Sequence, residues 1–213
     1  MEKAESTAAQ SLYEEETLPP RIERAFEDVP YPGDDRLVPD PSHWEGGRIA
    51  QEFAGQHWKT IPLDVLSSYL ESLSYFTPES FRYYLPAYLL AAVRRLSAAE
   101  VSTRAVDIPE ALAYHLTPPR QGAALDEYLA TMTGLTPEHK TFIREQQGPA
   151  LEEFRARMSG LTLAQKTVIR DLFRWLDQRG KEWEKAHLPE HAQRGDEADE
   201  WEIVLKEYWE NVK

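Results

Sequence analysis

The chain has 213 residues, of which 41% are hydrophobic and 11% aromatic, and it contains no cysteine. This composition is that of a globular protein with one core, and the lack of cysteine excludes disulfides, thiolate metal sites and cysteine nucleophiles. The net charge of −13 argues against nucleic acid as a ligand, since phosphate binding needs clustered Lys and Arg. No apolar run is long enough to span a membrane and no secretory signal is recognisable, so we expect a cytoplasmic protein without membrane contact.

The negative charge is concentrated at the two ends of the chain. Residues 1–60 carry −7 and residues 173–213 carry −4, while the middle is close to neutral. An acidic surface commonly keeps a protein soluble and monomeric. The alternative interpretation is that the protein has a basic partner.

The first helix is predicted after Thr17. Thr17 has the character of a helix N-cap, and Ile22 and Phe26 lie one helical turn apart on one face. This helix should end before Pro30. Residues 30–47 are then rich in Pro, Gly and Asp, which predicts an irregular segment that is either functional or poorly ordered.

The most apolar part of the chain follows two short helices, which we expect at 47–55 and 62–73. Thr77 begins a longer helix, because it precedes a proline at the first helical position and an acidic residue in the first turn. This helix is apolar nearly all round up to Leu96, so it should be the buried centre of the fold. Pro86 inside it removes one backbone hydrogen bond and predicts a kink.

A tandem duplication follows a predicted helix at 108–116. Residues 121–146 and 147–172 align without a gap and are identical at 14 of 26 positions. Each copy is predicted to be a helical hairpin, with Gly134 or Gly160 in a left-handed turn and Thr136 or Thr162 as the next N-cap. Two copies are too few for a free-standing solenoid, so they should pack on the rest of the core.

These elements predict an all-α protein, a single-domain irregular helical bundle with a tandem duplicated helical hairpin. Residues 1–16 are interpreted as a disordered acidic N-terminus and residues 17–213 as the domain. Trp201, Leu205, Tyr208 and Val212 are spaced as one face of a C-terminal amphipathic helix at 196–212.

Three strings resemble an uncharacterised bacterial family, classed as a domain of unknown function. They are the segments 18–26 (LPPRIERAF), 30–35 (PYPGDD) and 76–89 (FTPESFRYYLPAYL). The resemblance covers residues 17–97 and extends to one hairpin copy. It implies no activity and no functional residue, and the second hairpin copy is a departure from the family pattern.

Motifs with chemical meaning are few. His187 to His191 matches an inverted zinc-peptidase string, but Pro189 interrupts the helix that such a site needs, so we predict no metal and no cofactor. No nucleophile elbow, phosphate loop or dinucleotide pattern occurs, which disfavours an ordinary enzyme.

The candidate binding residues lie on the proline-rich segment, the short element after it and the central helix. They are Tyr31, Asp34, Asp35, His57, Trp58, Arg82 and Tyr84. Tyr and Arg commonly anchor binding sites, although a turn with capping aspartates and a tyrosine-filled core give the same pattern.

The leading hypothesis is a non-enzymatic protein-binding module, an immunity-type protein that neutralises a basic partner such as a toxin domain. It depends on the acidity, the lack of catalytic motifs and the extra hairpin. The alternative is a small-molecule-binding protein or an unrecognised enzyme that uses Tyr31, Asp34, Asp35, His57 and Arg82. The sequence does not give the oligomeric state.

Overall fold

Helices make up the regular structure of the computed structural model, which describes residues 17–97, 107–187, 205 and 208–211. No strand occurs within these ranges, so the predicted all-α class is confirmed. The predicted disordered segment, residues 1–16, lies outside them. No helix in the described part of the chain has the length and hydrophobicity to cross a bilayer.

The first part of the chain forms short helices that surround one long one. They are α2 (Leu18–Phe26), η1 (Asp34–Arg36), α3 (Trp44–Phe53), η2 (Trp58–Thr60), α4 (Leu63–Ser68) and α5 (Ser72–Tyr75). α3 begins earlier than predicted because Gly46 and Gly47 lie directly against the preceding loop. A Cβ on either glycine would lie 2.6 or 2.7 Å from a backbone carbonyl oxygen, so glycine at these positions allows close packing rather than marking a loop.

The helix predicted at 62–73 is divided into α4 and α5, which corrects that prediction. Tyr69 leaves the helical region at φ −127° and ψ 46°. Its carbonyl oxygen accepts a hydrogen bond of 2.9 Å from the Tyr88 hydroxyl, and its ring packs edge-on against Phe53. The Ser72 amide also donates to the Tyr69 carbonyl oxygen at 3.1 Å, so this oxygen stays paired although the helix is broken.

The central helix, α6 (Pro78–Ser97), begins at the predicted residue. Thr77 caps it, since the Ser80 amide donates to the Thr77 hydroxyl at 3.2 Å. Phe81, Leu85 and Leu89 are fully buried, and α6 contacts α2, η2, α4 and three helices introduced below. α6 is therefore the core of the fold, as its sequence predicts.

The helix α7 (Asp107–His115) returns along α6 and anchors the end of the chain. The predicted C-terminal helix at 196–212 lies largely outside the described residues, among which Leu205 is helical and Trp209–Asn211 form the turn η4. Trp209 is fully buried and its indole N–H donates to the Leu116 carbonyl oxygen at 2.9 Å. Trp209 was not among the residues predicted to form the apolar face of this helix. Leu205, which was among them, is buried as expected.

The duplicated region forms α8 (Gly122–Thr131), α9 (Pro137–Ser159) and α10 (Leu163–His187). The boundary between the copies, after Gln146, falls inside α9, so the second helix of one copy continues into the first helix of the next. Pro149 lies within α9, where its missing N–H removes the helical hydrogen bond to Glu145, and both residues are exposed.

The turns of the two copies agree with the prediction at their caps and differ at their glycines. His139 donates to the Thr136 hydroxyl at 3.3 Å, and Thr162 and Gln165 cap each other reciprocally at 3.2 and 3.0 Å. Gly134 has φ +84° as predicted, but Gly160 has φ −75° and is not left-handed. The Gly160 carbonyl oxygen instead accepts a hydrogen bond from Arg82 at 2.9 Å.

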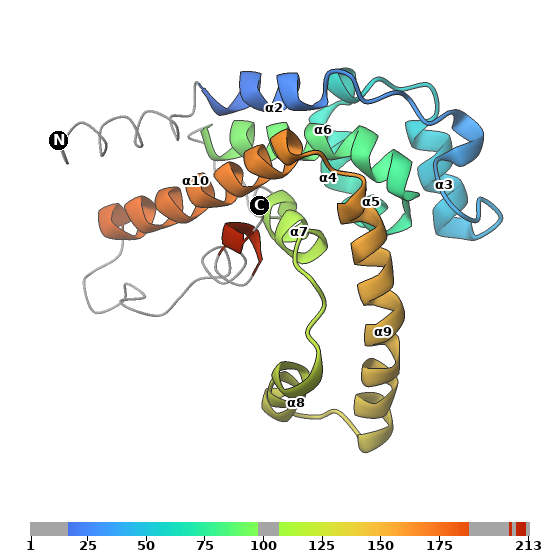
Figure 1. Ribbon diagram of the computed structural model, residues 1–213, viewed down its shortest axis with the longest axis vertical. Coiled ribbons are helices and arrows are strands. Elements are labelled where there is room, and N and C mark those ends of the chain that lie inside the picture. Colours follow the sequence, from blue (N-terminus) through green and yellow to red (C-terminus); the bar gives the residue numbers. More distant parts are fainter. Residues whose placement is uncertain (1–16, 98–106, 188–204, 206–207, 212–213) are drawn as a thin grey trace.

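The first copy, residues 121–146, projects from the body of the molecule as an arm (Figure 1). Leu125 and Leu129 are buried within it but do not belong to the main core cluster. The side-chain amide of Gln121 donates to the backbone oxygen of Gln147 at 3.1 Å, so the two ends of the arm meet. The second copy, by contrast, packs on α2 and α6.

Candidate functional site

Two of the predicted residues, Tyr31 and Asp34, contact each other and fix the proline-rich segment in place. The Tyr31 hydroxyl donates to the Asp34 carboxylate, and the Gly55 amide donates to both, at 2.8 and 2.9 Å. Burial and the hydrogen bond to Asp34 raise the pKa of Tyr31. Gly55 has φ +67°, which favours glycine at this turn. These groups hold the loop onto the C-terminal end of α3.

His57, Trp58 and Tyr84 lie next to this pair. The His57 ring stacks on Trp58 with 5.7 Å between centroids, and its Nδ1 accepts from the Lys59 amide at 3.2 Å. Trp58 is buried in the core, and the Tyr84 hydroxyl donates to the Phe53 carbonyl oxygen at 2.6 Å. Burial raises the pKa of Tyr84, which keeps it neutral. Both aromatic residues are thus bound into the core.

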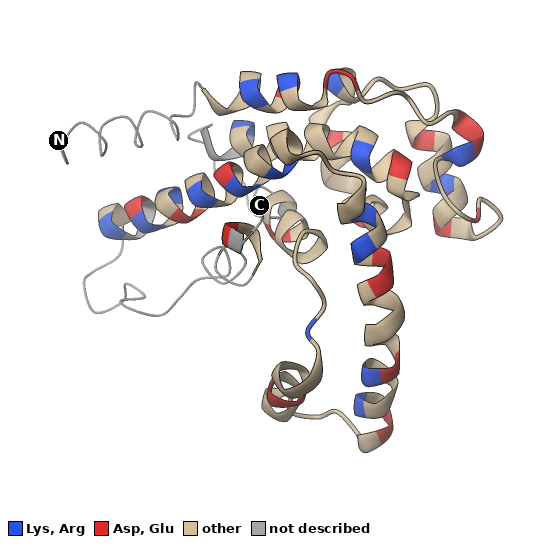
Figure 2. Cartoon of the chain, in the orientation of Figure 1, with Lys and Arg blue, Asp and Glu red and all other residues tan. Residues whose placement is uncertain are grey.

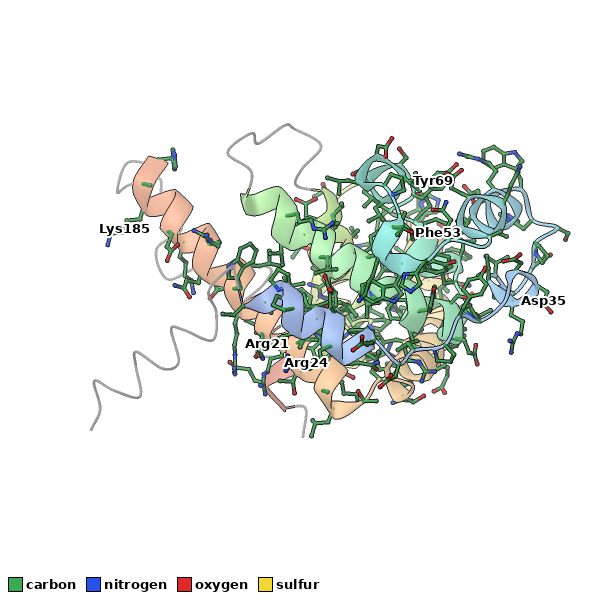
Figure 3. All side chains as sticks on the ribbon, turned by 90° about the horizontal axis from the view of Figure 1, so that it is seen from above. Arg21, Arg24, Asp35, Phe53, Tyr69 and Lys185 are labelled. Atoms are coloured by element: carbon green, nitrogen blue, oxygen red, sulfur yellow. The ribbon has the colours of Figure 1, made fainter. Side chains whose placement is uncertain are left out.

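Asp35 and Arg82 are not brought to this cluster. Asp35 is exposed and lies at the edge of the molecule (Figure 3). Arg82 points toward the end of α9, where it binds Gly160. Among the described residues, no group of three or more His, Asp or Glu side chains is arranged to hold a metal ion. His191 of the zinc-peptidase string lies outside them.

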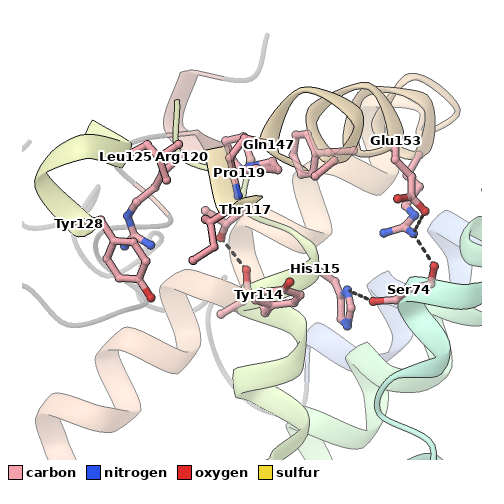
Figure 4. Close-up of a pocket in the computed structure, with 16 residues that line it drawn as sticks. Ser74, Tyr114, His115, Thr117, Pro119, Arg120, Leu125, Tyr128, Gln147 and Glu153 are labelled. Carbon is pink, nitrogen blue, oxygen red and sulfur yellow. Dashed lines mark hydrogen bonds and ion pairs between the residues drawn. The ribbon is translucent and has the colours of Figure 1, made fainter. Parts of the chain in front are cut away.

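A cleft of about 580 Å³ separates the arm from the body. Figure 4 shows Arg120, Leu125 and Tyr128 at one end, His115, Ser74 and Glu153 at the other, and Thr117, Pro119 and Gln147 between them. α9 closes one wall with a helical stripe: Ile143, Gln147, Ala150, Phe154 and Arg157. A volume of this size suits a small organic molecule.

The body end of the cleft holds two buried polar side chains. Arg157 and His115 are each only 7% exposed. Arg157 forms an ion pair with Glu153 and donates to the Ser74 carbonyl oxygen at 2.8 Å, while its Nε has no hydrogen-bond partner. Burial, and secondarily the charge of Arg157, lower the pKa of His115 to about 4, so His115 is neutral at pH 7.

The arm end of the cleft holds an exposed cation. The Arg120 guanidinium lies 4.5 Å from the ring centroid of Tyr128. No carboxylate within the described ranges forms an ion pair with it. The cleft therefore carries two guanidinium groups against the single carboxylate of Glu153.

The two repeat copies expose equivalent residues very differently. Phe142 of the arm is 61% exposed, whereas Val168 at the equivalent position of the second copy is 4% exposed. Four further pairs follow the same rule, with the arm residue the more accessible one: Tyr128 and Phe154, Met132 and Met158, Leu135 and Leu161, Ile143 and Ile169. The face that docks the second copy on the body is thus accessible on the first.

Acidic side chains flank this accessible face. Glu138 and Glu145 stand four residues before and three after Phe142, so both lie beside it on the surface of α9. Both carboxylates are exposed. The pKa of Glu138 is lowered by hydrogen bonds from its own backbone amide and from the Thr136 side chain. Arg144 on another side of the helix is engaged with Asp126 at 2.9 Å.

Residues 39–146 match a family model described as "Family of unknown function (DUF6714)". The match spans half of the chain. The chain belongs to this family. No curated protein and no solved structure matches the chain.

The DUF6714 match includes α3, α6 and the whole arm, and it ends at Gln146, the last residue of the first copy. The second copy and the PYPGDD string at 30–35 lie outside the matched range. The match therefore contains one hairpin copy, whereas this chain has two.

Sequence reasoning missed Phe142, Arg120 and the buried pair His115 and Arg157. One signal for the accessible face is present in the alignment of the copies. Gln146 of the arm replaces Leu172, which is fully buried in the second copy. A polar residue at a core position of one copy indicates that this copy does not dock in the same way.

Proposed function

We propose that this chain is a protein-binding module and that the arm is its contact surface. The observation that carries the proposal is the exposure of Phe142 where the equivalent Val168 is buried. The second copy needs its apolar face for docking on α2 and α6. The first copy keeps an apolar face of the same kind without a partner in the described part of the chain, which is typical of an interaction site.

The partner that fits this surface best is a basic protein, such as the toxin domain neutralised by an immunity-type protein. An aromatic residue with two flanking carboxylates, Glu138 and Glu145, complements an apolar patch with a basic rim. The net charge of −13 would steer such a partner over a longer range. α9 and α10 themselves carry both signs along their length (Figure 2), so the local acidic rim and the acidic ends of the sequence supply the complementarity.

The alternative, a small-molecule site or an enzyme at Tyr31, Asp34, Asp35, His57 and Arg82, has less support. Tyr31 and Asp34 are engaged with Gly55, and Arg82 with Gly160. Hydrogen-bonding groups that hold loops and helix ends together are less accessible to a ligand.

The test is affinity capture with the intact chain and two variants matched in exposure. Phe142→Ser alters the arm, and Leu163→Ser alters a residue of the second copy that is also 61% exposed. We expect a basic protein to be captured by the wild type and by Leu163→Ser, and to be lost with Phe142→Ser. The captured protein would then be purified and its binding measured with all three chains.

Equal capture by the three chains would contradict the arm as contact surface. Thermal unfolding provides the folding control, because neither exposed side chain contributes to the core and both variants should melt like the wild type.

A further inference from the structure

The cleft between the arm and the body is a second candidate site, separate from the face around Phe142. Phe142 and Ile143 are neighbours in sequence and therefore point about 100° apart on α9. Ile143 lines the cleft and Phe142 does not. A small molecule in the cleft would leave the proposed protein contact free, so this inference does not depend on the proposed function.

The walls of the cleft are mainly apolar. Leu125, Ile143, Ala150 and Phe154 contribute aliphatic and aromatic surface from two helices, and Pro118 and Pro119 close the side toward α7. Such walls bind the apolar part of a ligand and leave its orientation to a few polar groups.

The charges at the two ends of the cleft differ. At the body end, Arg157 is neutralised by Glu153 in direct contact. At the arm end, Arg120 stacks on Tyr128 and has no carboxylate partner in the described part of the chain. The uncompensated charge of the cleft is therefore positive and lies at its accessible end, in a protein whose net charge is −13.

We propose that the cleft binds a small amphipathic carboxylic acid. Its carboxylate would pair with the Arg120 guanidinium, which offers a planar set of donors suited to that group. Its apolar body would extend along Ile143 and Ala150 toward Phe154. Arg120 would repel a cation at this end of the cleft, and a neutral molecule of the same shape would forgo the charged hydrogen bond.

The probes for this site are 2-naphthoate and 2-naphthamide, which share one ring system and differ in charge. Binding to the full chain is followed by amide chemical shifts in nuclear magnetic resonance spectra, with Thr117, Gln147 and Ala150 as reporters in the cleft. We expect 2-naphthoate to shift these amides and to bind about tenfold more tightly than 2-naphthamide, the difference that one charged hydrogen bond supplies.

Three variants locate the interaction. Arg120→Gln should remove the preference for 2-naphthoate, and Ala150→Trp should prevent binding of both probes by filling the cleft. Arg155→Gln is the matched control, because Arg155 is an exposed arginine on α9 that pairs with Glu152 and does not line the cleft. It should bind like the wild type.

The proposal is overturned if the cleft amides do not shift with 2-naphthoate, or if both probes bind equally to the wild type. It is also overturned if Arg120→Gln and Arg155→Gln weaken 2-naphthoate to the same extent, since a general effect of net charge would then explain the preference. Arg120 is exposed, so its variant should fold, which the unchanged remainder of the spectrum would verify.

Discussion

Phe142 and Val168 occupy the same position in two copies of one repeat, and the first is exposed to solvent while the second is buried against the body. Gln165 and Asp171 of the second copy add polar contacts to this docking, with the Ala25 carbonyl oxygen at 3.1 Å and with the Arg21 guanidinium. Among the described residues, no hydrogen bond or ion pair joins the arm to α2. The two copies thus differ in their packing: the second stabilises the fold, whereas the first keeps the equivalent face exposed, which supports the contact surface that we propose.

Asp171 and its arm equivalent Glu145 should differ in their contribution to stability. The Asp171 side chain is 5% exposed and contacts Arg21, Arg170 and Arg174, which are partly exposed. Asp171→Ala should therefore cost roughly 1 to 3 kcal/mol, less than for a fully buried pair. Glu145→Ala is the control and should leave the free energy of unfolding within about 0.5 kcal/mol. Denaturant titration of both variants checks this, and equal losses would show that the copies are docked alike.

Truncation of the central helix should be costly. Leu85 and Leu89 are fully buried on α6, so Leu85→Ala or Leu89→Ala should lower the free energy of unfolding by about 2 to 5 kcal/mol. Denaturant titration measures the change. A loss below about 1 kcal/mol would mean that α6 is peripheral.

The buried His115 should make stability depend on pH. Its pKa is about 4 in the folded state, below the usual value near 6.5, so the unfolded chain binds its proton more readily. The stability that this difference contributes is complete above about pH 6.5 and is lost as pH falls toward 4, on the order of 3 kcal/mol in total.

His115→Asn isolates that contribution, because an asparagine does not titrate. The wild type should lose more free energy of unfolding than the variant between about pH 7 and pH 4.5. Parallel losses in the two proteins would indicate that His115 is protonated in the folded state.

Much of the fold could be predicted because it depends on local signals. The cap at Thr77, the caps at Thr136 and Thr162, and the apolar α6 are determined by residues within one or two turns. The continuous α9 was not predicted, because Gly148 and Pro149 resemble a boundary between elements. Both residues are exposed on the surface of α9, and the helix accommodates them there.

The candidate site was harder to predict, because it depends on tertiary docking. The two copies share their periodicity and most of their apolar residues, so beyond the replacement of Leu172 by Gln146 little in the local pattern distinguishes the exposed Phe142 from the buried Val168. Arg120 and Arg157 lie 37 positions apart in sequence and line one cleft only because the chain returns along the arm. Tyr31 and Asp34, in contrast, lie three positions apart in sequence, so their contact depends on local geometry.

Association with a basic partner should weaken with salt, since the acidic ends of the chain act over a screened distance. Replacing Asp196, Glu197, Asp199 and Glu200 with their amides should slow association more than it speeds dissociation. Surface plasmon resonance between about 50 and 500 mM salt measures both rates. An association rate that does not change with salt would show that electrostatic steering does not contribute to binding.

Excision of the second copy, residues 147–172, should leave a folded but less stable protein. The arm would then be joined to Phe173 in the same register and would have to dock in place of the second copy. Phe142 and Gln146 would occupy the sites of Val168 and Leu172, which introduces excess volume and a buried polar group. Insoluble product without cooperative unfolding would show that the arm cannot dock on the body.

Excision of the arm, residues 121–146, tests the central claim most directly. Its ends already meet through Gln121 and Gln147, and Gln147 would follow Arg120 as Gln121 does now. We predict that the shortened protein unfolds cooperatively with a melting temperature within about 4 °C of the wild type, the shift that about 1 kcal/mol produces in a chain of this size. We also predict that it no longer captures the partner that the intact chain binds. A shortened protein that fails to fold, or that folds and still captures the partner, would contradict the assignment of the arm to binding.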